Sequence, residues 1–289
     1  MEASLLTSVI LPASLFIIML GMGLSLVLDD FRRVVKYPKA TIIGLVNQLI
    51  LLPLMAFAMV KVLGLAPLTA VGFMLIAACP GGVTSNLIAH VSKGDTALSI
   101  TLTAISSFTT VITIPLIVSF SLSHFMDNSQ SIQLPVGKTI IQILSITVIP
   151  VSIGMFIRNR FPDFAIKMDK PTRIASTIIF IIILVSVIAT NLELVRENMG
   201  TLGWISLLLL MLTMALGFFS AKLFKLNLSQ QISIAIESGI QNGALAIVIA
   251  TTLLEQSELS LPAAIYSLVM FLPAGLIMWY CGGRKTKLT

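Results

Sequence analysis

The sequence predicts an all-α protein that crosses a membrane many times. Hydrophobic residues make up 57% of its 289 residues, charged residues make up 10%, and the mean hydropathy is +1.04. Soluble domains carry about 25% charged residues, so we expect no soluble domain of useful size. A transmembrane helix needs about 20 largely apolar residues. Nine stretches satisfy this requirement: Leu5–Leu28, Ala40–Leu63, Leu68–Val91, Thr96–Leu122, Val136–Ile157, Thr172–Leu192, Leu202–Lys222, Gln231–Leu254 and Leu261–Cys281.

Short polar connections join these stretches, and the longest of them are Ser123–Pro135 and Arg158–Pro171. The first stretch is not expected to be a signal peptide, because it lacks a basic start and its apolar run is too long. Cys79 and Cys281 lie far apart in the sequence and predict neither a disulfide framework nor a metal site. We therefore expect residues 1–289 to form a single transmembrane unit.

The positions of Lys and Arg predict the orientation in the membrane. If the odd-numbered connections face the cytoplasm, only Lys61, Lys138 and Arg196 of the 18 basic residues fall on the outer side. The positive-inside rule then places the N-terminus outside and the C-terminus in the cytoplasm of an inner or plasma membrane. Basic cytoplasmic connections also explain the net charge of +6, so no nucleic-acid partner is expected.

Two of the nine stretches are interrupted near their middle. The third contains Cys79-Pro80-Gly81-Gly82, and the eighth contains Glu237-Ser238-Gly239-Ile240-Gln241-Asn242-Gly243. Proline removes a backbone donor and glycine favours unwinding. Because the two stretches are offset by five helices, they run in opposite directions, which is typical of inverted repeats whose discontinuous helices cross near the membrane midplane. A simple kink in each helix is the alternative interpretation.

Glu237 is the acid that the pattern singles out. The other acids fall in connections or near helix ends, whereas Glu237 lies well inside an apolar stretch with no Lys or Arg at the same depth. A carboxylate there costs at least a few kcal/mol unless it is protonated, binds a cation or faces water. We interpret it as functional; a hydrogen-bonded structural glutamate is the alternative.

The breaks also indicate candidate binding groups, because each break leaves backbone carbonyls and amides without helical partners. Carbonyls near Cys79 and around Glu237–Ile240 suit a hard cation. Amides at Val83–Thr84 and Asn242–Gly243 suit an anion. This combination favours cation-coupled uptake of an organic anion.

Polar side chains elsewhere in the apolar stretches could line the same site. Ser99, Thr103, Ser106 and Thr110 recur at helical spacing on the helix after the first break, and the amide pair Asn47-Gln48 lies inside the second stretch. Hydrogen bonding between helices explains each of these residues equally well.

Several of these segments resemble the bile acid:sodium symporter family, which includes the apical sodium-dependent bile acid transporter. The order and spacing of the matching segments agree over essentially the whole chain. They are Met19-Leu20-Gly21-Met22-Gly23-Leu24, Cys79-Pro80-Gly81-Gly82 with Ser85-Asn86, Lys93-Gly94-Asp95-Thr96-Ala97-Leu98-Ser99, and Glu237-Ser238-Gly239-Ile240-Gln241-Asn242.

The resemblance implies a nine-helix transporter of the bacterial type, with a panel (5–28 and 136–192) packed against a core (40–122 and 202–281). It also implies two sodium ions, both of which use Glu237. The first would be held by Ser85, Asn86, Ser99, Thr103 and Glu237. The second would be held by Gln48, Glu237, Gln241 and backbone oxygens of Ser238 and Ile240.

By the same resemblance, the substrate is an organic anion such as a bile acid or a small carboxylate, and the protein functions as a monomer. The residues that face the substrate would be Val83, Thr84, Asn242 and Gly243. Many family members have Thr directly after Pro-Gly-Gly, where this chain has Val83. This difference falls on the substrate contact and leaves the predicted ion residues intact.

Other functions remain open at this point. A proton-coupled carrier would use Glu237 as a titrating group, and a metalloid efflux carrier of related fold would use the thiol of Cys79. A channel would need a continuous polar pore, and a sensor or scaffold would need a signalling domain or a long tail. We do not expect an enzyme, because His90 and His124 lie near helix ends or in a connection without the partners that acid–base chemistry needs.

Overall fold

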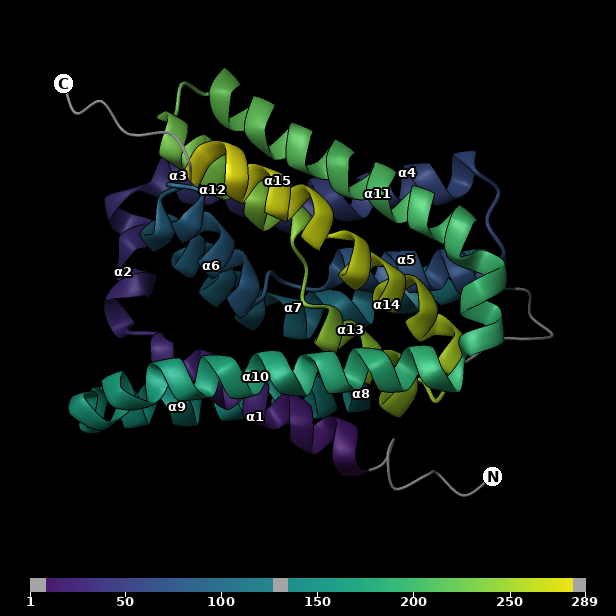
Figure 1. Cartoon of the computed structure of the whole chain (residues 1–289), viewed down its shortest axis with the longest axis horizontal. Helices are drawn as coiled ribbons and strands as arrows, with labels where there is room; N and C mark the ends of the chain where they lie inside the picture. The colour runs from purple at the N-terminus through teal and green to yellow at the C-terminus, as the bar shows by residue number, and fades with distance from the viewer. Residues whose placement is uncertain (1–8, 127–134, 283–289) are drawn as a thin grey trace.

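The computed structural model describes residues 9–126 and 135–282. Within these ranges the chain is helical, apart from its connections and one isolated β-bridge (Figure 1). The predictions that concern Leu5–Ser8, residues 127–134 and the basic residues Arg284, Lys285 and Lys287 lie outside the described residues.

The elements include α-helices and a few short π- and 3₁₀-helical turns. In chain order they are α1 (Leu11–Ser25), α2 (Leu28–Lys36), α3 (Pro38–Val46), η2 (Asn47–Leu51), α4 (Leu52–Val62), α5 (Pro67–Ala78), α6 (Val83–Val91), α7 (Thr96–Phe125), α8 (Val136–Ile143), η3 (Leu144–Val148), α9 (Ile149–Arg160), α10 (Pro162–Thr190), α11 (Leu192–Leu223), α12 (Leu228–Gly239), α13 (Gly243–Val248), η4 (Ile249–Leu253), η5 (Ser257–Leu259), α14 (Ser260–Val269) and α15 (Phe271–Gly282).

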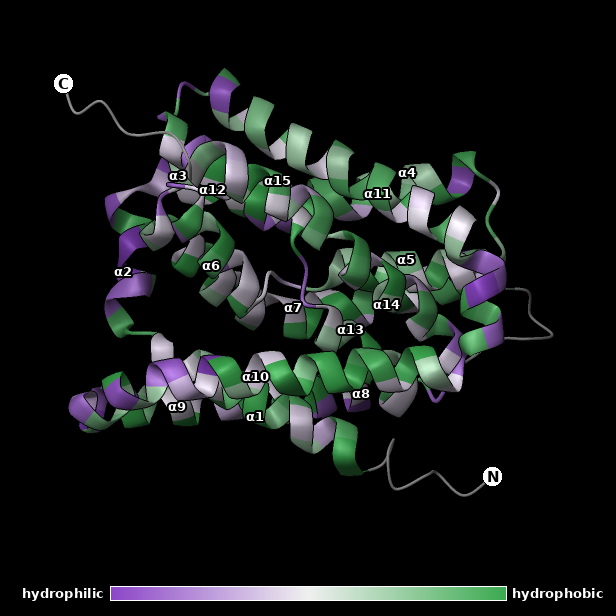
Figure 2. Ribbon diagram, in the orientation of Figure 1, coloured by the Kyte–Doolittle hydropathy of each residue, from purple (hydrophilic) through white to green (hydrophobic). Residues whose placement is uncertain are grey.

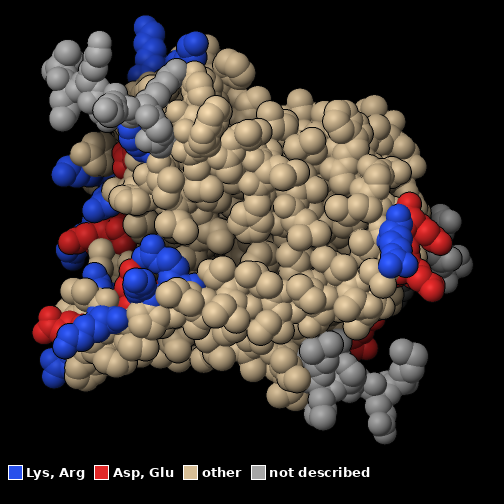
Figure 3. All heavy atoms as spheres, in the orientation of Figure 1, with Lys and Arg blue, Asp and Glu red and all other residues tan. Residues whose placement is uncertain are grey.

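The protein is an all-α, multi-pass membrane protein. Among the described residues, six helices are long and apolar enough to cross a membrane, and α1 with α2 makes a seventh if this pair, bent by 62°, counts as one span. Charged side chains gather at two opposite ends of the molecule, with a broad uncharged band between them (Figure 3). The predicted count of nine spans stays a prediction; it depends on treating the two broken stretches as spans.

Two predicted boundaries were wrong. The segment Arg158–Pro171 was expected to be a connection, but α10 begins at Pro162. Similarly, α11 begins at Leu192, about ten residues before the predicted start at Leu202. Hydropathy marks only the apolar part of a helix, whereas polar turns that project from the membrane are equally helical. Pro162 occupies the first turn of α10, where proline is tolerated because no intrahelical donor is lost.

The helices α1, α9 and α10 pack against one another and lie along one edge of the molecule (Figure 1). Glycine allows this close approach: a Cβ on Gly154 would lie 2.5 Å from the Leu20 carbonyl oxygen, and one on Gly23 would collide with the Val151 backbone. Small residues at such contacts are typical of packed membrane helices. These three helices come from the segments predicted to form the panel, and the division into panel and core stays a prediction.

The two broken stretches meet at their breaks. Helix α5 ends before Cys79 and α6 begins at Val83, while α12 ends at Gly239 and α13 begins at Gly243. Gly81 and Gln241 form an antiparallel bridge, in which the Asn242 amide donates to the Pro80 carbonyl at 2.9 Å. The extended linkers cross near the middle of the molecule (Figure 1). Hydrophobic residues dominate the surrounding helices (Figure 2).

Candidate functional site at the crossing of the broken helices

Glu237 lies in the last turn of α12, beside the crossing, and is only 1% exposed. Thr103 of α7 donates a hydrogen bond to Oε1 at 2.5 Å, and Ser99 donates to Oε2 at 3.1 Å. The carboxylate also packs against the backbone of Gly81, leaving no room for a Cβ there. The ion pairs found among the described residues lie in α2 and α10, so only neutral donors are seen to contact this carboxylate.

The residues predicted for the first sodium site come together around this carboxylate. The Asn86 side-chain oxygen accepts hydrogen bonds from Ser99 at 2.8 Å and from Thr103 at 3.1 Å. The buried Ser85 hydroxyl donates to the Gly82 carbonyl and interacts with Glu237. Helices α6, α7 and α12 thus supply a compact group of oxygen atoms with one formal negative charge, which is chemistry that suits a monovalent cation.

A second polar cluster joins η2 to both breaks. The Gln48 side-chain amide donates to the Cys79 carbonyl at 2.9 Å and to the Gln241 side-chain oxygen at 2.8 Å. Gln241 in turn donates to the Ser238 carbonyl at 3.1 Å. The Gln48 Oε1 atom is buried without a hydrogen-bond partner. A buried polar atom without a partner costs about 1–3 kcal/mol, so a cation at this oxygen would satisfy it.

Two members of the second predicted set contribute backbone only. The Ser238 hydroxyl donates back to the Ile234 carbonyl at 2.7 Å, which leaves the Ser238 backbone oxygen as its group nearest Gln241. Ile240 lies fully buried in the linker itself. The neighbouring Gly239 carbonyl accepts a hydrogen bond from Tyr266 at 2.7 Å, which anchors this linker to α14.

A cavity opens beside the crossing, between α6 and α13 on one side and α1 and α10 on the other. The cavity is open at one end. All four residues predicted to face the substrate line it: Val83, Thr84, Asn242 and Gly243. Apolar side chains, including Met22 and Phe180, complete its wall.

The amides at the second break are not free, contrary to expectation. Asn242 N–H bonds the Pro80 carbonyl, and Gly243 N–H bonds the Gln241 carbonyl at 3.0 Å. The Asn242 side chain caps α13 by accepting from Leu245 N–H at 3.1 Å. At the first break, by contrast, no side chain caps α6. The backbone donors at the start of α13 are therefore used within the crossing, whereas the N-terminus of α6 has no side-chain cap.

Sequence reasoning missed Arg173, which lines the cavity together with Ser176, Thr177 and Phe180 of α10. It was counted only among the basic residues of the cytoplasmic side, although it lies at the start of the predicted helix Thr172–Leu192. Positions 173, 176, 177 and 180 all fall within that predicted helix and follow helical spacing, so they share one face. The contact of this face with the crossing comes only from the tertiary structure.

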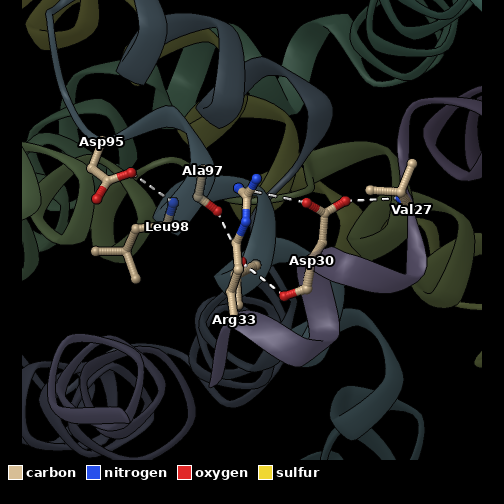
Figure 4. A network of polar contacts seen from close by, with 7 residues as sticks. Val27, Asp30, Arg33, Asp95, Ala97 and Leu98 are labelled. Carbon is tan, nitrogen blue, oxygen red and sulfur yellow. Dashed lines mark hydrogen bonds and ion pairs between the residues drawn. The ribbon is translucent and has the colours of Figure 1, made fainter. Parts of the chain in front are cut away.

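A second buried acid was also missed. Asp30 is 4% exposed although it stands at the start of α2. Its carboxylate accepts from Val27 N–H at 2.8 Å and lies 3.7 Å from Arg33 (Figure 4). Thr101 of α7 donates to the backbone oxygen of Asp30 at 3.0 Å. This network fastens α2 to α7 at the bend that follows α1.

Cys79, His90 and His124, which the metalloid-carrier and enzyme alternatives would use, are not among the residues that line the cavity. Cys79 is buried, and its backbone carbonyl, rather than its thiol, takes part in the second cluster. His124 packs among the rings of Phe57, Phe120 and Phe125, and His90 contacts Thr96 at 3.3 Å.

An all-α membrane protein with a buried, cation-suited site beside an apolar cavity has the architecture of a secondary transporter. The chain matches the Sodium Bile acid symporter family over residues 12–198, and it belongs to that family. Members of the family are transporters rather than enzymes, so a sodium-coupled transporter is the class that this chain represents.

Three relatives illustrate the similarity. The uncharacterized sodium-dependent transporter YocS of Bacillus subtilis is 33% identical over 276 residues, which cover 94% of this chain and 82% of that protein. The human ileal sodium/bile acid cotransporter is 28% identical over 266 residues, covering 89% and 73%. The "Probable sodium/metabolite cotransporter BASS2, chloroplastic" of rice is 27% identical over 255 residues, covering 88% and 59%.

Proposed function

We propose that this protein is a symporter that couples the inward movement of sodium to the uptake of an organic anion. Two sodium ions bind at the two polar clusters of the crossing, and the anion binds in the adjacent cavity. The panel and the core then move relative to each other, so that the site opens to either side of the membrane in turn. The N-terminus lies outside and the C-terminus lies in the cytoplasm of an inner or plasma membrane, and one chain suffices.

The observation that carries this proposal is the environment of Glu237. Its carboxylate is fully buried at a break in the membrane helices, and the groups seen to contact it are neutral hydroxyls and backbone. An isolated charge in such a place is costly. A sodium ion held by Glu237, Asn86 and the nearby hydroxyls removes that cost. Sodium binding at this site is therefore favourable.

The second cluster supports a second ion. Gln48 and Gln241 bring three kinds of oxygen together: the partnerless Oε1 of Gln48, the Gln241 side-chain oxygen and backbone carbonyls. Hard cations prefer such ligands. Two sodium ions against one Glu237 carboxylate leave a local charge of +1, which a monovalent anion in the neighbouring cavity neutralises. Sodium and substrate therefore load cooperatively.

Uptake of labelled anions into proteoliposomes tests the proposal. An inward sodium gradient is expected to drive accumulation of cholate or of a branched keto acid, and replacing sodium by potassium on both sides is expected to abolish it. Accumulation that persists without any sodium would contradict the proposal. A panel of both anion types is needed because the relatives include proteins named as bile acid cotransporters and as metabolite cotransporters.

Proton coupling is the second candidate. A buried site whose side-chain hydrogen bonds come from hydroxyls could also hold Glu237 in its protonated form. The two candidates differ in which gradient drives uptake. A pH gradient imposed in sodium-free buffer would drive accumulation only if protons replace sodium.

A further inference from the structure

One basic side chain, Arg173, stands at the open end of the cavity. Arg173 is the charged residue among those that line this cavity. Its side chain is 41% exposed, whereas Asn242, at the crossing, is 7% exposed and Met22 is 1% exposed. Arg173 therefore lies toward the mouth of the cavity, and Asn242 and Met22 lie toward its closed end.

The polar and apolar parts of the cavity wall are arranged along α10. Arg173 is followed by Ser176, Thr177 and Phe180 on the same face, and seven residues of α-helix span about 10 Å. The remaining wall is largely apolar, with Ile18 and Met270 among its members. The cavity thus matches a molecule that has one anionic end and an apolar body.

Asp169 forms an ion pair with the guanidinium of Arg173 in this structure. It lies one turn earlier on α10, and its carboxylate is 2.5 Å from Nη2. Both side chains are partly exposed, and exposed pairs of this kind contribute about 0–1 kcal/mol. The guanidinium has five donors in a planar fork that suits carboxylates. An incoming anion can therefore compete with Asp169 for Arg173.

We propose that Arg173 is a substrate-selecting residue that binds the anionic group of the substrate, and that Asp169 takes the place of this group when the cavity is empty. The substrate class that follows is a singly charged organic carboxylate or sulfonate with an apolar body. This assignment rests on the proposed function, because it concerns the same cavity. Since α10 and the crossing lie on opposite walls, a bound substrate would connect the two.

Arg173 and Asp169 allow a sharp test of the proposal, because neutralising one or the other should change the affinity for the anion in opposite directions. A pair that only stabilises α10 loses the same interaction in Arg173→Gln and in Asp169→Asn. A substrate-selecting arginine predicts weaker anion binding in Arg173→Gln and tighter binding in Asp169→Asn, where the competitor is lost. Arg160→Gln is the matched control, since Arg160 is exposed on α9 and does not line the cavity.

The experiment measures the Kd of cholate and of 3-methyl-2-oxobutanoate for the full-length protein in lipid nanodiscs with saturating sodium. Arg173→Gln is expected to raise Kd about tenfold, Asp169→Asn to lower it about two- to threefold, and Arg160→Gln to leave it unchanged. The uncharged methyl esters are expected to bind all four proteins equally weakly. Sodium-induced thermal stabilisation without anion is expected to persist in Arg173→Gln, which shows that the variant is folded.

Two failures are distinguishable. If neither anion shows sodium-dependent binding to the unaltered protein, the proposed function is wrong and this assignment falls with it. If sodium-dependent binding is present but Arg173→Gln has an unchanged Kd, or Asp169→Asn weakens binding as Arg173→Gln does, only the role of Arg173 is overturned.

Discussion

The two breaks have similar backbones but different chemistry. The first, Cys79–Gly82, supplies a proline, two glycines and an uncapped helix, and its side chains carry no charge. The second supplies Glu237, Gln241 and Asn242, and its following helix is capped by one of its own side chains. The crossing of the two linkers is therefore chemically asymmetric.

This asymmetry has a steric cause. The Glu237 carboxylate needs space beside the first linker, and Gly81 provides it by having no side chain. The linker of the first break therefore makes room for the Glu237 side chain of the second break. The difference teaches that the proposed ion site belongs to neither broken helix alone and exists only where both meet. Four changes separate the contributions of the two breaks.

Removing the acid of the second break should have the largest effect. We expect Glu237→Ala to abolish sodium-driven uptake, a loss of at least about 100-fold, and Glu237→Gln to come close to it, because the charge that balances sodium is gone. Uptake into proteoliposomes and sodium titration by thermal shift measure this. Glu193→Gln, at an exposed acid of α11, is the control. Sodium-dependent uptake at the normal level in Glu237→Ala would show that the second break does not carry the ion site.

Filling the space beside Gly81 in the first break should impair sodium binding almost as much. In Gly81→Ala the new methyl group would collide with Glu237, so the carboxylate must move; overpacking of this kind costs about 1–3 kcal/mol. We expect the sodium-induced thermal shift to be lost. Gly82→Ala is the matched neighbour, because its Cβ would meet Thr84 Oγ1 at an ordinary 3.4 Å. Equal sodium responses in the two variants would contradict the steric argument.

The residue that connects the breaks should show an intermediate effect. Gln48→Leu removes the amide that contacts both Cys79 and Gln241. We expect the sodium concentration at half-maximal uptake to rise about tenfold and the Hill coefficient to fall toward one, because one of two ion sites is weakened. Asn47→Leu is the control, since Asn47 instead bonds Ser220 of α11 at 2.9 Å. A sodium dependence identical to that of the unaltered protein would remove Gln48 from the ion site.

The smallest effect is expected at the start of α6. Val83→Thr keeps the shape of the side chain and adds a hydroxyl on the cavity wall. We expect less than about a fivefold change in the half-saturating anion concentration, in favour of the polar keto acid over cholate, with sodium dependence unchanged. Competition between the two labelled anions measures this preference. A change in sodium affinity instead would place Val83 in the ion site.

Much of the site follows from sequence patterns of short range. The isolated acid, the Pro-Gly-Gly interruption and the mid-helix Gln48 are all visible as polar or helix-breaking residues in apolar stretches. The role of Arg173 could not be predicted in the same way, because a basic residue at the cytoplasmic start of a predicted helix is ordinary, and only the packing of α10 brings it to the cavity. The burial of Asp30 was hidden for a related reason: a charged residue near a helix end is normally exposed, and only its bonds to α7 and to Val27 explain the exception.

The sequence by itself determined that the chain is a helical membrane protein with two interrupted helices and one acid deep inside an apolar stretch. These conclusions need only the cost of placing polar groups in hydrocarbon, which acts residue by residue. The tertiary structure alone decided which groups meet. The pairing of Glu237 with Ser99, Thr103 and Gly81, the consumption of the amides of Asn242 and Gly243, and the place of Arg173 at the mouth of the cavity all depend on contacts between helices distant in the sequence.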